Sequence, residues 1–103
     1  MNKNKILSLL GLATKAGKVV SGEFATEKAV KSGKGLLVVV AEDASDNTKK
    51  KFSNMCHFYE VPLILVGDKE QIGKCTGKEF RASLAVLDEN FTKAIMKNYP
   101  SQD

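Results

Sequence analysis

Apolar residues recur along the chain in two alternating patterns. In residues 3–16 they return every three or four positions, which is typical of one buried face of a helix, at Ile6, Leu9, Leu10 and Ala13. The segment GLLVVVAED, residues 35–43, is instead a continuous β-branched run, which predicts a strand covered on both faces. Between these two segments, residues 18–20 read as a brief extended piece.

The alternation continues to the end of the chain. We expect Ser21 to cap a second helix that ends at Gly33 or Gly35. Further helices are predicted at residues 45–58, from Gly67-Asp68 to about Cys75, and at 89–97, and further strands at 63–67, after Pro62, and at 82–88. Helices alternating with apolar strands predict an α/β fold, a three-layer α/β/α sandwich with a small mixed sheet of about four strands.

Length and composition fit one such domain over residues 1–103, with the last few residues expected to be disordered. A chain of 103 residues can bury a core without disulfides or metals. The longest apolar run, Leu36 to Ala41, is far shorter than the ~20 residues of a membrane span. Lys3 and Lys5 before ILSLLGLA resemble a signal peptide superficially, but this stretch also reads as an amphipathic helix. We therefore expect a cytoplasmic protein with no membrane partner.

The positive charge is concentrated in the first third of the sequence. Residues 1–35 contain seven lysines and two acids, a net charge of +5, whereas the chain as a whole carries +4. A local basic patch is the usual footprint of a polyanion, most often nucleic acid. A solvated lysine-rich surface is the alternative interpretation.

The chain lacks the usual phosphate-binding and catalytic motifs. GLATKAGKV, residues 11–19, and GKCTGKE, residues 73–79, both miss the glycine spacing of a phosphate-binding loop. His57 is the only histidine and lies within a predicted helix. Glu42 and Asp43 end a predicted strand, where neighbours point to opposite faces and would not share a proton. We expect no enzyme activity and no cofactor.

The two cysteines, Cys56 and Cys75, are expected to be buried, reduced thiols. They lie in different predicted helices, and two cysteines do not make a disulfide framework. Further metal ligands at a recognisable spacing are not visible. We therefore expect no metal site.

One residue conflicts with the helical pattern of SGEFATEKAVKSGKG, residues 21–35. At about 100° per residue, the small and apolar side chains gather on one side, but Phe24 falls among the charged ones. Two interpretations stay open: Phe24 is an exposed platform for stacking, or it folds back on Val20 or a neighbouring helix.

Two longer stretches resemble a known family. VVSGEFATEKAVKSGKGLLVVVAEDAS is similar to a stretch of the ribosomal protein family of the seven-Ae, thirty-e and Gadd types, in which a glycine opens a helix, a lysine follows six residues later, and a strand ends in Ala-Glu-Asp. Gly22, Lys28 and Ala41-Glu42-Asp43 stand at the matching positions. QIGKCTGKEFRASLAVLD resembles the helix end, loop and last strand of the thirty-e branch. The resemblance covers about residues 3–96, and we expect the nearest relatives among small bacterial YlxQ-type members.

The resemblance implies an α/β/α sandwich that binds RNA, typically kink-turns, at the helix opened by Gly22 and the loop around Phe80. By position, Gly22 would approach the RNA bend, Lys28 would contact backbone or base edges, and Phe80 with Arg81 would close the other side. Phe80 has the same two interpretations as Phe24, with packing favoured just before a strand. The complete set of expected RNA-binding residues is Lys18, Gly22, Glu23, Phe24, Lys28, Lys31, Glu42, Lys78, Phe80 and Arg81.

Phe24 and Ala25 depart from the family pattern. Kink-turn binders usually carry Asn-Glu or Lys-Gln here, polar pairs that read tandem G·A pairs. We predict a non-catalytic, ribosome- or translation-associated protein that binds ribosomal or other structured RNA, with no DNA partner and with a ribosomal, transcription or translation protein left open as a further partner. The alternative is a protein-interaction module of the same fold that has lost kink-turn binding.

Overall fold

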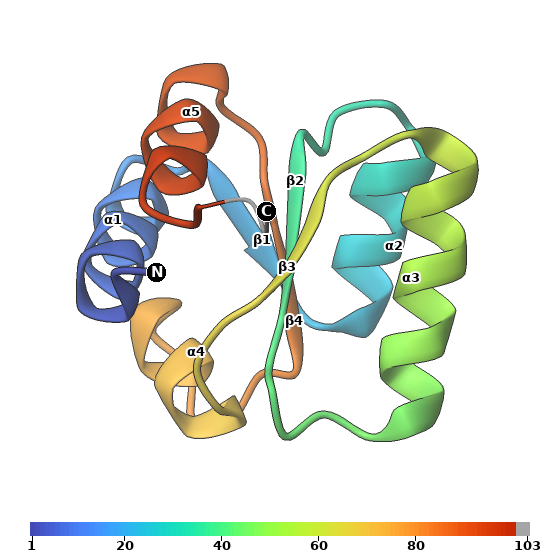
Figure 1. Ribbon diagram of the computed structural model, residues 1–103, viewed down its shortest axis with the longest axis horizontal. Helices are drawn as coiled ribbons and strands as arrows, with labels where there is room; N and C mark the ends of the chain where they lie inside the picture. Colours follow the sequence, from blue (N-terminus) through green and yellow to red (C-terminus); the bar gives the residue numbers. More distant parts are fainter. Residues whose placement is uncertain (101–103) are drawn as a thin grey trace.

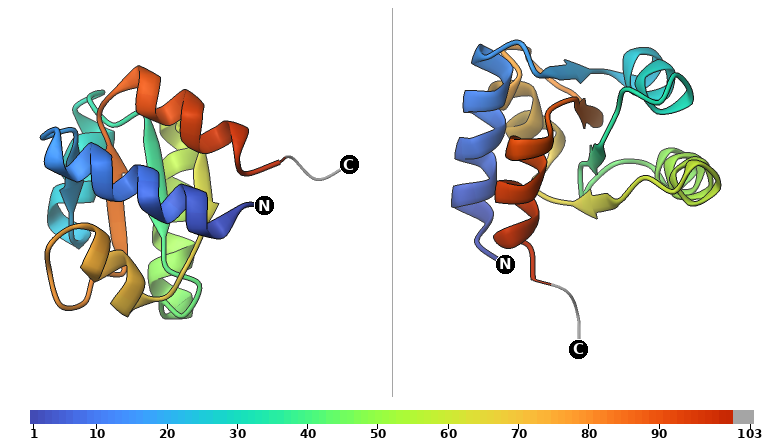
Figure 2. Two further views of the ribbon diagram at one scale, coloured as in Figure 1. Left: turned by 90° about the vertical axis from the view of Figure 1, so that its left-hand side faces the viewer. Right: turned by 90° about the horizontal axis from the view of Figure 1, so that it is seen from above.

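The computed structural model describes residues 1–100, and within them five helices surround a four-stranded sheet (Figure 1). In chain order the elements are α1 (Lys3–Lys15), β1 (Val19–Ser21), α2 (Glu23–Lys31), β2 (Leu37–Val40), α3 (Asp46–Tyr59), β3 (Leu63–Leu65), α4 (Lys69–Cys75), β4 (Ser83–Val86) and α5 (Glu89–Lys97). Helices α1, α4 and α5 cover one face of the sheet and α2 and α3 cover the other (Figure 2). The predicted α/β/α sandwich is confirmed.

The sheet is mixed, as predicted. Its strand order is β1-β4-β2-β3, with β2 and β3 parallel and the two other pairs antiparallel. Val40 pairs with both Leu65 and Ser83, and Ser21 pairs with Leu84. The carboxyl ends of β1, β2 and β3 and the start of β4 therefore meet at one edge of the sheet.

The core lies on both faces of the two central strands. Every residue of β2 and β4 is buried, which explains the continuous apolar run of β2. Ile6, Phe52 and Ile95, from α1, α3 and α5, are fully buried against them. This packing fixes the helix ends that reach the sheet edge.

The observed strands β2, β3 and β4 are all shorter than the predicted 35–43, 63–67 and 82–88, and the predicted start of the second helix was also wrong. Ser21 is not the cap of α2 but the last residue of β1, because the Gly22 N–H donates to the Ser83 carbonyl at 2.9 Å and extends the pairing with β4. The strand predicted over residues 35–43 ends at Val40, and Glu42 and Asp43 lie in a turn. The expected disorder of the last few residues concerns 101–103, which lie outside the described range.

In residues 1–100 no helix is long and apolar enough to span a lipid bilayer.

Candidate functional site

Four segments far apart in sequence converge at the sheet edge: the start of α2, the turn at residues 41–45, residues 66–68 and the loop at 76–82. Backbone hydrogen bonds join them. Ala41 donates to the Ala82 carbonyl at 2.9 Å, and Glu42 donates to the Gly67 carbonyl at 2.7 Å. We call these four segments the rim.

Gly22 begins α2 in a conformation that favours glycine. Its φ is 97°, and a Cβ added there would lie 3.6 Å from the Arg81 Nε. Because glycine has no side chain to cap the helix, the amides of the first turn have no side-chain acceptor at the N-cap. Such amides, together with the helix dipole, favour a phosphate or another anion.

The loop at 76–82 can approach Gly22 because it passes close over α4 at Gly73, which has no side chain. A Cβ at Gly73 would collide with the backbone of Glu79 and Phe80. The Arg81 backbone donates to the Lys69 carbonyl at 3.0 Å, and the Arg81 Nε donates to the Ser21 Oγ at 3.2 Å. The loop is therefore tied to both α4 and the end of β1.

Both rim aromatics point to solvent. The Phe24 side chain is 80% exposed and that of Phe80 is 57% exposed. The interpretation that either ring packs inward does not hold. In the first turn of α2 the side chain that points to the sheet is that of Thr26, which is fully buried and accepts a hydrogen bond from the Ser83 hydroxyl at 3.3 Å.

Two of the predicted RNA-binding residues, Glu23 and Lys31, take part in ion pairs on the side of α2 that faces α3. Lys51 contacts Glu23 at 2.7 Å and Glu27 at 2.9 Å, and Lys31 contacts Glu27 at 2.7 Å. The hydrogen bonds from Lys31 and Lys51 lower the pKa of Glu27 to about 2. The bond from Glu27 raises the pKa of Lys31, and the bonds from Glu23 and Glu27 raise that of Lys51.

Lys51 was missed by sequence reasoning. The local spacing shows the i, i+4 pair of Glu27 and Lys31, but nothing in it identifies a partner on another helix. We call these four residues, Glu23, Glu27, Lys31 and Lys51, the ion-pair network.

The structure gathers only part of the predicted set. Located at the rim or in the first turn of α2 are Gly22, Glu23, Phe24, Glu42, Lys78, Phe80 and Arg81. Lys28 lies one turn further along α2, and its side chain forms no ion pair within residues 1–100. Lys31 ends α2, and Lys18 precedes β1, where its carbonyl accepts from Leu87, so both lie toward the opposite edge of the sheet.

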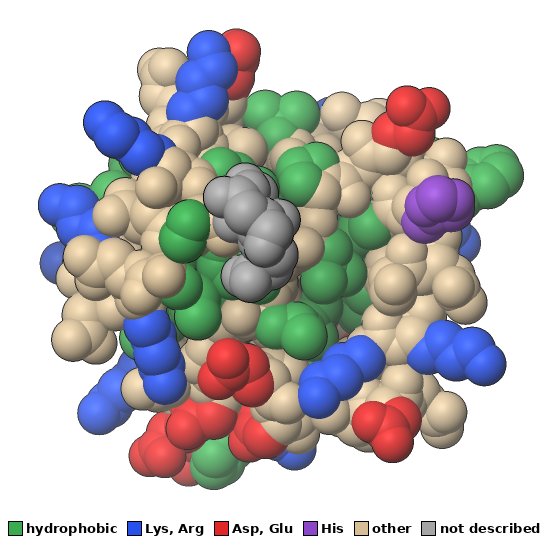
Figure 3. Space-filling model, in the orientation of Figure 1, with side chains coloured by type: hydrophobic (Ala, Val, Ile, Leu, Met, Phe, Trp, Pro, Cys, Tyr) green, Lys and Arg blue, Asp and Glu red, His purple; other side chains and the backbone are tan. Residues whose placement is uncertain are grey.

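The basic first third does not form one patch. Three of its seven lysines lie in α1 and two in α2, which cover opposite faces of the sheet. In Figure 3, basic side chains lie along the left margin, over α1 and α5, whereas acidic ones gather at the lower edge near α4. The exposed acids of the rim and the adjoining α4 are Glu23, Glu42, Asp43, Asp68, Glu70 and Glu79.

Both cysteines are free, and the predicted burial is confirmed for Cys56 but not for Cys75. Cys56 is buried, and burial raises the pKa of its thiol to about 11. Cys75 is half-buried, burial also raises its pKa, and its Sγ lies 3.3 Å from the Leu7 carbonyl. His57 is exposed on α3. Over residues 1–100 no group of three His, Cys, Asp or Glu side chains is placed to hold a metal ion.

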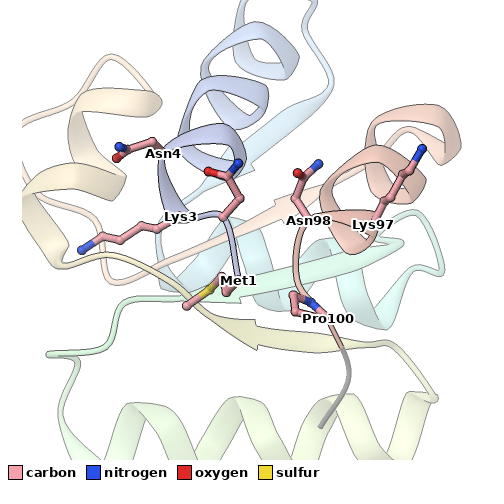
Figure 4. Close-up of a pocket in the computed structure, with 7 residues that line it drawn as sticks. Met1, Lys3, Asn4, Lys97, Asn98 and Pro100 are labelled. Carbon is pink, nitrogen blue, oxygen red and sulfur yellow. The ribbon is translucent and has the colours of Figure 1, made fainter. Parts of the chain in front are cut away.

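A wide, open hollow of about 750 Å³ lies where the start of α1 meets the end of α5 (Figure 4). Lys3 and Lys97 lie at opposite sides of the view, and the Asn2 backbone donates to the Asn98 carbonyl at 2.9 Å. None of the predicted RNA-binding residues lines it.

Comparisons with known proteins agree on one family. The model of the ribosomal protein L7Ae/L30e/S12e/Gadd45 family matches residues 4–96. The RNA-binding protein YlxQ of Bacillus subtilis is 42% identical over 88 residues, which is 85% of this chain and 88% of that protein. The RNA-binding protein YlxQ of Enterococcus faecium is 38% identical over 92 residues, 89% of this chain and 88% of that one. The resemblance predicted over residues 3–96 is confirmed.

Solved structures give the same fold. A protein of unknown function from Bacillus halodurans superposes with a TM-score of 0.86 at 38% identity, over 90% of this chain and 94% of that one. The Giardia lamblia 15.5kD RNA binding protein superposes with a TM-score of 0.78 over 91% of this chain and 81% of that one. Its 19% identity supports the fold alone.

Proposed function

This chain belongs to the ribosomal protein L7Ae/L30e/S12e/Gadd45 family, and from that premise we propose that it is a non-catalytic RNA-binding protein. We propose further that it recognises structured, kink-turn-like RNA at the rim and acts in the cytoplasm in association with the ribosome or with translation. Two relatives that cover most of its length are named RNA-binding proteins.

The observation that carries the proposal is the pairing of Gly22 with the loop at 76–82. The uncapped first turn of α2 offers backbone amides to a phosphate. Arg81 joins that helix start to the loop that exposes Phe80. An exposed phenylalanine beside an anion-binding helix end suits a bent RNA with an unstacked base.

Free cations next to these groups would add attraction that does not depend on sequence. Lys28 and Lys78 are exposed, and neither forms an ion pair in the described part of the chain. Each lysine that neutralises a phosphate releases counterions, so affinity should fall as salt rises.

Phe24 and Ala25 cannot read tandem G·A pairs through side-chain hydrogen bonds. Recognition would then rest on the shape of the bend, on phosphate contacts and on stacking. We therefore expect disruption of the G·A pairs to weaken binding through loss of the bend and not through loss of base contacts.

A direct test is titration of a labelled kink-turn RNA, and of a copy with disrupted G·A pairs, at two salt concentrations. We expect tighter binding of the intact kink-turn. Phe80→Ala should cost about 1–3 kcal/mol of binding, the usual range for a lost base–aromatic stack, with little change in melting temperature.

The matched control is Phe58→Ala, because Phe58 is 76% exposed but lies near the end of α3, away from the rim. It should bind RNA like the wild type. Weak binding that is equal for both RNAs and abolished by salt would contradict the proposal and leave only a basic surface.

The runner-up function, a protein-interaction module, is favoured by one observation. Phe58 and Tyr59 are exposed and meet edge to face, with ring centroids 4.9 Å apart. Aromatic side chains at the surface are enriched in protein interfaces. If this function is the correct one, Phe58→Ala should abolish binding to a partner protein, and the kink-turn RNA should not bind to the wild type.

A further inference from the structure

The ring of Phe24 stands between two hollows on the outer surface of α2. One, of about 450 Å³, lies on the side of Glu27 and Lys31. The other, of about 470 Å³, lies between α2 and β1, the outermost strand of the sheet, and Val20 of β1 and Leu87 line it. Lys28 borders both. We call the second one the β1-side hollow.

The two hollows differ in charge. The first contains Glu27, whose carboxylate is bound by Lys31 and Lys51. The β1-side hollow is lined by no acidic residue. Its two cations, Lys28 and Lys34, are exposed, and neither forms an ion pair with any residue that the structure describes.

The floor of the β1-side hollow is apolar. Val20, Ala25 and Leu87 are half-buried there, and Phe24 forms a wall with 80% of its side chain exposed. The small side chain of Ala25 leaves the space beside the ring open. The surface therefore combines a flat apolar contact with two uncompensated positive charges.

We propose that the β1-side hollow is a subsite for one unpaired nucleotide. The base stacks on Phe24 and lies over Val20 and Leu87, and its phosphate is held by Lys28 and Lys34. This inference rests on the proposed RNA-binding function and extends the bound surface from the rim to the flank of α2. It also gives a role to Phe24 and Ala25, which stand where kink-turn binders usually carry a polar pair.

Charge complementarity favours a nucleotide over an apolar peptide side chain. A peptide side chain would fill the floor but would cover two lysines without offering them a partner, and desolvating an unpaired charge is costly. A nucleotide supplies an aromatic face and an anion together. The volume of the hollow is within the range of small-molecule sites, roughly 300–1,000 Å³.

The test uses a single-stranded hexaribonucleotide that contains one 2-aminopurine, whose fluorescence is quenched when it stacks. We expect the wild type to quench it, Phe24→Ala to lose the quenching, and Phe24→Tyr to keep it. Lys34→Ala should weaken binding several-fold and lower the slope of log affinity against log salt by about one.

Two controls separate the subsite from general effects. Phe58→Ala removes an equally exposed phenylalanine, and Lys97→Ala removes an exposed lysine from the opposite layer. Both should behave like the wild type. Unchanged melting temperatures would show that all variants fold, which is expected because Phe24 is an exposed side chain.

The same variants titrated with the kink-turn RNA distinguish the failure of this inference from the failure of the proposed function. If the wild type binds the kink-turn but Phe24→Ala and Lys34→Ala match it with both probes, the subsite is overturned and the rim remains. If the wild type binds neither RNA, both proposals fall, and a protein side chain becomes the occupant to test in the hollow.

Discussion

The two flanks of α2 carry similar numbers of lysines, but on one flank the lysines form ion pairs and on the other they do not. On the flank that faces α3, Lys31 and Lys51 share the carboxylates of Glu23 and Glu27 at 2.7–2.9 Å. On the flank that faces β1, Lys28 borders a hollow with no acid in its lining. Only Lys28 and Lys31 belong to α2 itself, since Lys51 comes from α3 and Lys34 follows the end of α2.

The difference shows that a count of lysines does not measure the charge available to a polyanion. A lysine that already holds a carboxylate must give up that contact before it can neutralise a phosphate. A lysine without a partner can neutralise a phosphate by releasing its counterion and losing only its own side-chain mobility. The proposed RNA contact therefore lies on the flank that has fewer charged groups but whose lysines are not paired with carboxylates.

We call the flank that faces β1 the open flank and the flank that faces α3 the closed flank. The largest effect should come from placing an acid on the open flank. Ala25→Glu puts a carboxylate three residues before Lys28 and inside the β1-side hollow. It would pair with that lysine and repel the incoming phosphate, so RNA affinity should fall at least tenfold, or about 1.4 kcal/mol. Filter binding or fluorescence anisotropy with the kink-turn RNA measures this loss.

The control is Ser53→Glu, which adds the same charge at an exposed position of α3. Its affinity should change far less, because distant exposed charges are screened by salt. Equal losses in the two variants would mean that only net charge matters and that the flanks are equivalent.

Much of this architecture was predictable from local pattern. A continuous apolar run identified β2, and the helix start predicted at Gly67-Asp68 agrees with α4, which Asp68 caps in a reciprocal capping box with Gln71. The wrong cap at Ser21 has a non-local cause, since Ser21 is held in β1 by pairing with β4 and its hydroxyl accepts from Arg81.

The candidate site was only partly predictable for the same reason. Helical periodicity placed Phe24 among charged side chains, but it could not decide between exposure and packing, which depends on what lies above α2. Lys18 and Lys31 were expected among the RNA-binding residues of the basic first third, but Lys31 ends α2 and Lys18 precedes β1, so both lie away from the rim. Lys51 joins the site region only through tertiary packing.

A smaller effect should follow from opening the closed flank. Glu27→Gln removes the carboxylate shared by Lys31 and Lys51 and leaves Lys51 only Glu23. Lys31 would become free to contact a phosphate. RNA affinity at low salt should rise by less than about tenfold, and the salt dependence should steepen by about one phosphate contact.

Glu89→Gln is the matched control for this change. It removes the partner of Lys93, 3.3 Å away on α5, and alters the net charge by the same amount on the opposite layer. If both variants strengthen binding equally, the gain comes from net charge, and the ion-pair network does not withhold Lys31 from RNA.

The smallest expected effect is a pH dependence of stability that belongs to the closed flank. Lys31 and Lys51 hold the pKa of Glu27 at about 2, below its ordinary value of 4.5. A carboxyl whose pKa is lowered by folding stabilises the native state above the unfolded pKa, and this contribution is lost as pH falls through the folded pKa. The network should therefore weaken between about pH 4.5 and 2.

Thermal unfolding of the wild type and of Glu27→Gln across this range isolates the contribution. The wild type should melt slightly higher at pH 7, and the gap should close as pH approaches 2, because protonated Glu27 resembles glutamine in charge. A gap that stays constant would show that Glu27 stabilises α2 by packing instead of charge. The lysines of the closed flank would then be less firmly held than their distances indicate, and the two flanks would differ less than their ion pairs suggest.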